Sequence, residues 1–290
     1  MIVKFTTTIR NLLDDLCSNI IENSNWIQVS SNKDAVTGDR IILKSPTYGD
    51  NSRNVYIQLK ENTTYSSDTD QKASYCFYAN LLESYSPAAQ GSNGTIGGNV
   101  SCSHYVGYNA FGYNLYYNRK IKINVTLNIE NHRIIFIFEH YGQGDSYTIP
   151  SVLYVGYPKD YQETSISFCH AIVSSKSNNV ASASNYILKE SSGDRITGPK
   201  ITKSYPPFFV PNYNGYYTLS SIMLDSSSYG YFGILDGIYS LPNSNVRSGQ
   251  ILIDGTNQYL VVDTLQATNA TNANISQHGF PTKMIAVSLQ

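Results

Sequence analysis

One stretch of this sequence alternates between apolar and polar residues more regularly than any other. From 121 to 129, Ile, Val or Leu occupies every second position, and Lys, Asn or Thr lies between them. Successive side chains of a strand point to opposite faces, so the pattern predicts a strand with one buried and one wet face. A turn at 130–132 leads into the apolar run 133–138, which together predict a long antiparallel hairpin. The side chains expected in the core are those of Ile123, Val125 and Leu127.

The N-terminal region follows a different period. Apolar residues recur there three and four positions apart, the spacing of one face of a helix. They are Ile9, Leu12, Leu13, Leu16, Ile20 and Ile21. Thr8 is placed to cap the start of the helix, and Asn23-Ser24-Asn25 is placed to end it. We expect Trp26 to fold back over the apolar face.

Shorter apolar runs predict further strands. Those in the N-terminal half are 40–44 and the alternating segment 55–60, in which Val55, Ile57 and Leu59 form the apolar face. Those in the C-terminal third are 230–241, 250–253, 258–262 and 283–287. Asp254-Gly255 predicts a tight turn between the middle two of these runs.

Long polar stretches separate the predicted strands. Residues 61–117 are dominated by Ser, Asn, Gly and Tyr, residues 174–200 form a second polar stretch, and 264–281 is expected to be a loop. A segment as long as 61–117 without clear periodicity is uncommon inside a compact domain. We expect it to be an elaborated loop or an irregular extended region that makes contacts between subunits.

The composition agrees with a mainly β fold. Only 14% of residues are charged, and Tyr is abundant at 25 copies, which suits half-buried pleated surfaces. We expect an α+β, mainly β protein, in which the N-terminal helix packs on a mixed or antiparallel sheet with a long hairpin and elaborated loops. Residues 1–173 form the predicted helix-and-hairpin domain. Residues 174–290 form a strand-rich C-terminal region, either separate or part of the same domain.

The charge pattern limits the partners of the chain. Its net charge is −1 and it has no basic run, so we expect neither sequence-independent nor sequence-specific binding of nucleic acid. No apolar stretch approaches the roughly 18 residues of a membrane span, and residues 1–10 lack the apolar segment of a signal peptide. We therefore expect synthesis in the cytoplasm and no membrane partner.

Searches for catalytic and metal-binding motifs give weak signals. The four cysteines are scattered and the five histidines follow no metal-ligand spacing. These residues are Cys17, Cys76, Cys102 and Cys169, and His104, His132, His140, His170 and His278. His132 falls in the hairpin turn, where exposure to solvent is expected. The glycine-rich segments 94–98 and 107–112 lack the Lys-Ser/Thr of a phosphate-binding loop. The sequence therefore predicts no catalytic residue, no metal site and no cofactor.

Carboxylates leave one chemical alternative open. Asp14 and Asp15 lie on the polar face of the predicted helix, where we expect them to be solvated. Asp145, Asp160 and Glu163 lie in a Tyr-rich region that could bind or cleave a carbohydrate. Tyr-rich loops also build wet protein interfaces, and this interpretation is favoured.

The order of these segments resembles that of a family of bacteriophage virion structural proteins. The helix ending near Trp26 is followed by GDRIILKSP (38–46), by NVYIQL (54–59) and by the hairpin NRKIKINVTLNIENHRIIFIFEH. Next comes the segment YTIPSVLYVGYPKDYQETS. The pattern closes with YGYFGILDGIYSLPNSNVRSGQILIDGTNQYLVV and then TKMIAVSL. The chain departs from the family where Gly142-Gln143-Gly144 interrupts a Pro-rich and Tyr-rich run.

The resemblance implies a non-enzymatic part of a phage tail or of a phage-tail-like particle, assembled in the cytoplasm of a bacterial host. It favours a tail terminator or collar subunit that forms a ring, a hexamer matching tail symmetry, and contacts tail tube and sheath proteins. A baseplate or fibre-attachment protein of the same particle is the first alternative. A carbohydrate-binding or carbohydrate-cleaving surface protein is the second.

Overall fold

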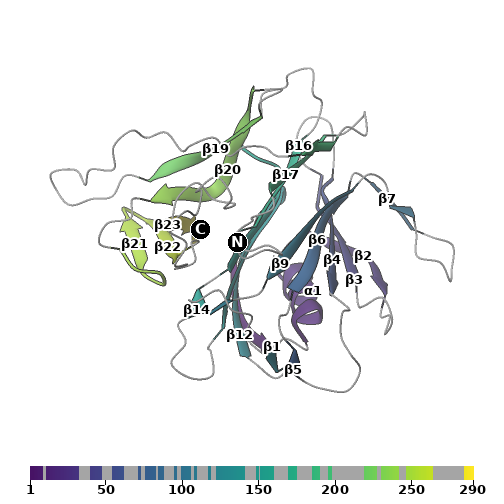
Figure 1. Ribbon diagram of the computed structural model, residues 1–290, viewed down its shortest axis with the longest axis horizontal. Coiled ribbons are helices and arrows are strands. Elements are labelled where there is room, and N and C mark those ends of the chain that lie inside the picture. Colours follow the sequence, from purple (N-terminus) through teal and green to yellow (C-terminus); the bar gives the residue numbers. More distant parts are fainter. Residues whose placement is uncertain are drawn as a thin grey trace.

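A seven-stranded antiparallel sheet lies in the middle of the molecule, with a five-stranded sheet on either side of it (Figure 1). The computed structural model describes residues 1–8, 11–32, 40–47, 54–61, 71–72, 76–82, 84–87, 95–96, 99–105, 108–109, 117–118, 122–140, 148–149, 151–159, 169–174, 185–189, 195–197, 219–226, 230–241, 246–263 and 284–290. Within these residues the fold is α+β and mainly β, as predicted, with one short helix.

The predicted hairpin forms part of the central sheet. β12 (Lys122–Ile129) and β13 (Arg133–His140) are antiparallel, with Val125 opposite Phe138. The side chains of Ile123, Val125 and Leu127 are buried, as predicted. The expected wet face is wrong at Asn128, which is 1% exposed because its side chain lies against the C-terminal sheet.

The remaining strands of the central sheet come from both halves of the chain. They are β1 (Ile2–Thr8), β15 (Ser151–Gly156), β16 (Cys169–Ser174), β17 (Asn185–Lys189) and β18 (Arg195–Thr197). The sheet order is β1-β12-β13-β15-β16-β17-β18. The expected domain boundary at residue 173 falls within β16, and the same sheet continues through β17 and β18.

The N-terminal segment differs from the prediction before residue 12. Thr8 ends β1, which pairs with β12 from Ile2 to Thr8, and does not cap a helix. The helix α1 (Leu12–Glu22) begins after Asn11, whose side chain makes no capping hydrogen bond, and ends at Asn23 as predicted. Pairing with β12 overrides the local helical spacing because it satisfies a whole row of backbone groups. Trp26 is 1% exposed and packs in the same core as the helix, as predicted.

A five-stranded sheet packs on one side of the central sheet, with α1 in the same core. Its strands, in order, are β2 (Ile27–Asn32), β3 (Arg40–Lys44), β4 (Tyr56–Glu61), β6 (Cys76–Leu82) and β9 (Asn99–Tyr105). The predicted strands at 40–44 and 55–60 are confirmed. The prediction of one elaborated loop over 61–117 is wrong, because β6 and β9 lie inside it and pair along their full lengths. The sequence of β9, NVSCSHY, is mostly polar, whereas β6, CFYANLL, is an apolar run broken only by Asn80 that the polar composition of the surrounding segment obscured.

A second five-stranded sheet packs on the other side of the central sheet. Its strands, in order, are β19 (Ser220–Ser226), β20 (Gly230–Leu241), β23 (Met284–Ser288), β22 (Asn257–Asp263) and β21 (Ile251–Asp254). All four predicted C-terminal strands are present. The predicted tight turn is confirmed between β21 and β22, where Gly255 has a φ of +60°. The expected loop at 264–281 lies outside the described residues.

Three short two-stranded pairs complete the described structure. They are β5 (Gln71–Lys72) with β11 (Tyr117–Asn118), β7 (Tyr85–Ser86) with β8 (Thr95–Ile96), and β10 (Tyr108–Asn109) with β14 (Thr148–Ile149). Among the described residues, no helix has the length and apolar character needed to cross a membrane.

The central sheet contributes to two separate cores because alternate residues of a strand face opposite sides. Ile134, Phe136 and Phe138 of β13 pack with α1, Trp26 and the N-terminal sheet. Ile135 and Ile137 of the same strand pack with the C-terminal sheet. Full burial of each such side chain stabilises the fold by about 1.5–3 kcal/mol, so β13 holds three layers together.

Candidate functional site: a polar cluster between two sheets

A buried cation lies at the start of β13. Arg133 follows the hairpin turn, and its side chain lies on the same face of the strand as Ile135, toward the C-terminal sheet. The residue is only 3% exposed. A guanidinium removed from water needs charged or hydrogen-bonding partners, because its desolvation is otherwise very unfavourable.

The charged partner comes from the C-terminal sheet. Nε of Arg133 donates to Oδ2 of Asp236, in β20, at 2.9 Å. The next residue, Gly237, has a φ of +77°, and a Cβ built there would lie 2.7 Å from Nη2 of Arg133. Glycine at 237 therefore lets the backbone of β20 approach the guanidinium closely.

His132 contacts the same carboxylate oxygen. Its Nε2 lies 3.3 Å from Oδ2 of Asp236, and the two side chains are 13% and 22% exposed. The expectation that His132 is solvent-exposed in the turn is therefore wrong, because β20 covers this turn. Burial acts to raise the pKa of Asp236, but hydrogen bonds from His132 and Arg133 and the charge of Arg133 outweigh it. The net pKa is well below the ordinary range, so Asp236 is ionised at neutral pH.

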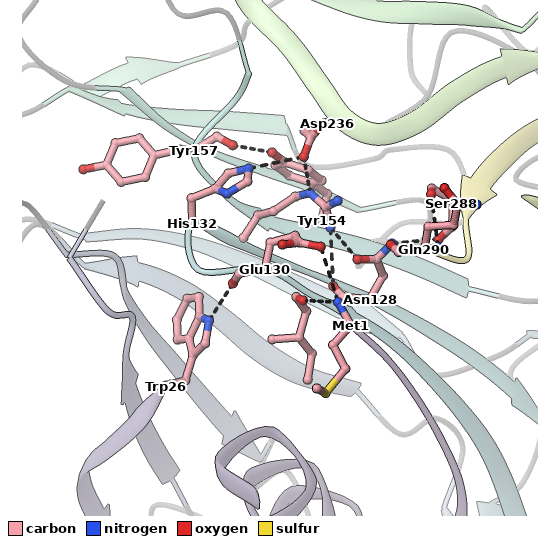
Figure 2. Close-up of polar contacts among 12 residues, drawn as sticks. Met1, Trp26, Asn128, Glu130, His132, Tyr154, Tyr157, Asp236, Ser288 and Gln290 are labelled. Atoms are coloured by element: carbon pink, nitrogen blue, oxygen red, sulfur yellow. Dashed lines mark hydrogen bonds and ion pairs between the residues drawn. The ribbon is translucent and has the colours of Figure 1, made fainter. Parts of the chain in front are cut away.

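Asn128 extends the contacts to a third strand. Its Oδ1 accepts from Nη1 of Arg133 at 2.9 Å, and its Nδ2 donates to the carbonyl of Ser288, at the end of β23, at 2.7 Å. Figure 2 shows Asn128 and His132 of the hairpin lying toward Asp236 and Ser288 of the C-terminal sheet. We call Asn128, His132, Arg133 and Asp236 the interlayer polar cluster.

The hairpin turn beside this cluster is also fixed from the opposite side. Nε1 of Trp26 donates to the carbonyl of Glu130 at 2.8 Å (Figure 2). The carbonyl of His132 accepts from the backbone N–H of Tyr157 at 2.9 Å. A Cβ at Gly156, whose φ is +147°, would lie 2.4 Å from that carbonyl. The turn thus contacts segments that precede and follow it by tens of residues.

The contacts define what the cluster can do. One carboxylate oxygen serves both His132 and Arg133, and the guanidinium is divided between Asp236 and Asn128. Such charge-assisted bonds fix orientation strongly. The polar atoms named here bind other parts of the same chain, so the cluster joins the central sheet to the C-terminal sheet.

Sequence analysis did not single out Arg133 or Asp236, although a signal for each was present. Arg133 heads the apolar run RIIFIF, and Asp236 lies within GYFGILDGIYSL. A lone charge inside an apolar strand predicts a buried partner of opposite sign. The signal does not say which residue that partner is, because the two are 103 positions apart.

The structure places some of the other candidate residues. Cys17 is buried and donates to Oε1 of Gln28 at 3.2 Å, and burial raises the pKa of its thiol to about 11. Asp15 is not merely solvated as expected, since it accepts a hydrogen bond from the hydroxyl of Thr7. Six further candidates lie in strands, and their side chains are outside the described set. They are Cys76, Cys102, Cys169, His104, His140 and His170. The remaining candidates lie outside the described residues. They are His278, Asp145, Asp160, Glu163 and the segment Gly142-Gln143-Gly144. In the part of the chain described, no three His, Cys, Asp or Glu residues are grouped as metal ligands.

An aromatic pair lies on the C-terminal sheet. The rings of Tyr239 and Tyr259 are 5.5 Å apart between centroids and nearly perpendicular, at 88°. This edge-to-face contact is favourable for the pair. It does not present both rings as one flat platform on which a sugar could stack.

No protein-family model matches the chain, and no curated protein matches it.

Proposed function

We propose that the chain is a structural, non-enzymatic subunit of a tailed bacteriophage or of a phage-tail-like particle, such as an R-type bacteriocin or another contractile injection system. In this proposal, copies of the chain form a ring, a hexamer matching tail symmetry, that ends the tail tube and sheath as a terminator or collar. Its partners are other copies of itself and the tube and sheath proteins. It assembles in the cytoplasm of the bacterial host.

The observation that supports the proposal most strongly is that the polar atoms of the interlayer polar cluster bind other parts of the same chain. Its charged and polar side chains connect two sheets of the same chain, which is a structural use rather than a chemical one. Two stacked cores on either side of one sheet make a rigid frame. The resemblance of the ordered sequence segments to phage virion proteins supplies the kind of particle.

The proposal is tested by deleting the gene in the producing bacterium and imaging the particles by electron microscopy. A terminator stops growth of the tube and sheath, so its loss should give tails of variable and excessive length. The protein should also be found by mass spectrometry in purified wild-type particles. Tails of normal length in the deletion strain, or particles that lack the protein, would contradict the proposal.

The same deletion experiment distinguishes a terminator from a baseplate or fibre-attachment protein. A baseplate or fibre-attachment protein acts at the other end of the tail, so its loss should leave length control intact. The deletion strain would then give either no assembled tails or complete tails that do not bind cells. Either result would indicate that the protein belongs to the baseplate and not to the terminator.

A further inference from the structure

Large exposed apolar side chains are few in the described residues, and most of them lie at the edges of sheets. Apart from Met1, they are Ile27, Ile251 and Ile253, which are 51%, 41% and 66% exposed. Ile27 begins β2, and the other two lie in β21. Both strands lie at the ends of their sheet orders, so all three isoleucines are on edge strands.

The edge at β21 is short, and it carries no lysine, proline or bulge that would oppose pairing with another strand. Among the described strands it pairs only with β22, which leaves backbone N–H and C=O groups along its other side. Ile251 and Ile253 are two residues apart and therefore project from the same face. The strand sequence is ILID, which contains no lysine or proline, and its one charge is at the end, on Asp254.

The edge at β2 is similar in chemistry. Among the described strands it pairs only with β3, and its sequence IQVSSN contains no charged residue and no proline. A register shift between Gln28 and Ser30 interrupts its pairing with β3. The shift limits any ladder on the outer side of β2 to a few residues, and β21 is itself a strand of four residues.

The two edges belong to the two outer layers. β2 is in the N-terminal sheet and β21 is in the C-terminal sheet, and Figure 1 shows them toward opposite ends of the long axis of the molecule. Two unlike surfaces on opposite sides of a subunit are what a head-to-tail contact requires. Such contacts close into rings when the rotation between neighbouring copies permits.

We propose that the β21 edge of one copy of this chain pairs with the β2 edge of the next copy, extending a sheet across the subunit boundary and covering Ile27, Ile251 and Ile253. The inference depends on the proposed function in that it supplies the contact from which the ring is built. Backbone hydrogen bonds hold the added strand, and the isoleucines supply apolar contact. β2 carries no charge, so Asp254 meets no like charge there.

A second copy accounts for both edges with one contact. A different protein bound at β21 would leave Ile27 exposed, and a different protein bound at β2 would leave Ile251 and Ile253 exposed. Exposed apolar edges without such cover favour uncontrolled aggregation. Pairing β21 with β2 covers the three side chains in every subunit of a closed ring.

The test uses the full-length purified protein and the variants Ile27→Lys and Ile253→Lys, each of which places a charge on one edge. Both side chains are largely exposed, so far-UV circular dichroism and the melting temperature should be close to those of the wild type. Ser18→Lys, on the exposed side of α1, is the matched control. Analytical ultracentrifugation should show an oligomer for the wild type and the control. Each edge variant should be monomeric, or should assemble only at about tenfold higher concentration or more.

A mixing experiment tests the head-to-tail geometry. Ile27→Lys retains an intact β21 edge, and Ile253→Lys retains an intact β2 edge, so an equal mixture should form dimers and stop there. A monomeric wild type at high concentration, oligomers of either variant like those of the wild type, or loss of assembly in Ile253→Lys alone would overturn the inference. These outcomes are independent of tail length in the deletion strain, so the inference can fail while the proposed function stands.

Discussion

Arg133 and Asp236 are 103 positions apart in the chain, and their side chains meet at 2.9 Å between Nε and Oδ2. This contact joins the first residue of β13 to β20 across the boundary between two sheets. It occurs where the hairpin turn, the C-terminal sheet and Trp26 come together (Figure 2). Contacts among all three layers therefore meet in one small region, which makes it a good target for substitutions.

Asp236→Ala should destabilise the protein by roughly 2–4 kcal/mol, because it leaves the buried guanidinium of Arg133 without its carboxylate. The expected loss of stability is moderate because the side chain of Asp236 retains some contact with solvent. Urea unfolding followed by circular dichroism measures the change. Asp254→Ala, at an exposed turn, is the control and should change stability by less than about 0.5 kcal/mol. Equal effects of the two substitutions would show that the ion pair does not stabilise the fold.

Gly237→Ala should destabilise the fold by about 1–3 kcal/mol or more. Alanine there adopts a positive φ and places its Cβ against the guanidinium of Arg133. Gly249→Ala is the matched control, since Gly249 has a φ of +85° and nothing within 4 Å of an added Cβ. The difference between the two variants in urea unfolding isolates the crowding at Arg133. No difference would mean that only the backbone conformation matters.

The contribution of Asp236 should depend on pH. Its folded-state pKa is lower than its unfolded-state pKa, so the stability it contributes is fully present above the ordinary carboxyl pKa of about 4. That stability is lost as the pH falls toward the folded-state pKa. The wild type should therefore lose more of its melting temperature than Asp236→Asn between pH 6 and about 3. Parallel curves for the two proteins would count against this explanation.

Leu127→Ala should destabilise the fold by about 2–5 kcal/mol, because it leaves a cavity in the core between the central and N-terminal sheets. Lys122→Ala, at an exposed position of the same strand, should have little effect. Chemical denaturation of the two variants provides the comparison. A small effect of Leu127→Ala would mean that the hairpin is not central to the core.

Single replacement of His140, His170 or Asp160 by Ala should leave particle assembly, and infectivity or killing, largely unchanged, provided that the variant folds. The reason is that the proposed function has no chemical step. The assays are particle yield, and plaque formation or bacterial killing. Specific loss of a hydrolytic activity in any one variant, with normal folding, would replace the structural proposal by an enzymatic one.

Short-range patterns in the sequence predicted much of the frame. The alternation that places Val125 and Leu127 on one face predicts the hairpin, and the apolar run 230–241 predicts β20, because burial of one strand face leaves a period of two or a continuous apolar run. Periodicity did not reveal β6 or β9, because CFYANLL shows no regular alternation and NVSCSHY is mostly polar. β6 and β9 are held by pairing along their length, which composition does not reveal.

Local patterns were enough to predict that the chain is mainly β, that a helix ends near Asn23 and that Ile123, Val125 and Leu127 face a core. Each of these follows from neighbours a few residues apart. Three other features became visible only in the folded chain: Thr8 ends a strand, Asn128 is buried and Arg133 meets Asp236. These depend on which segments pack together, and contacts over 100 or more positions leave no periodic trace in the chain because each partner satisfies the other only after folding.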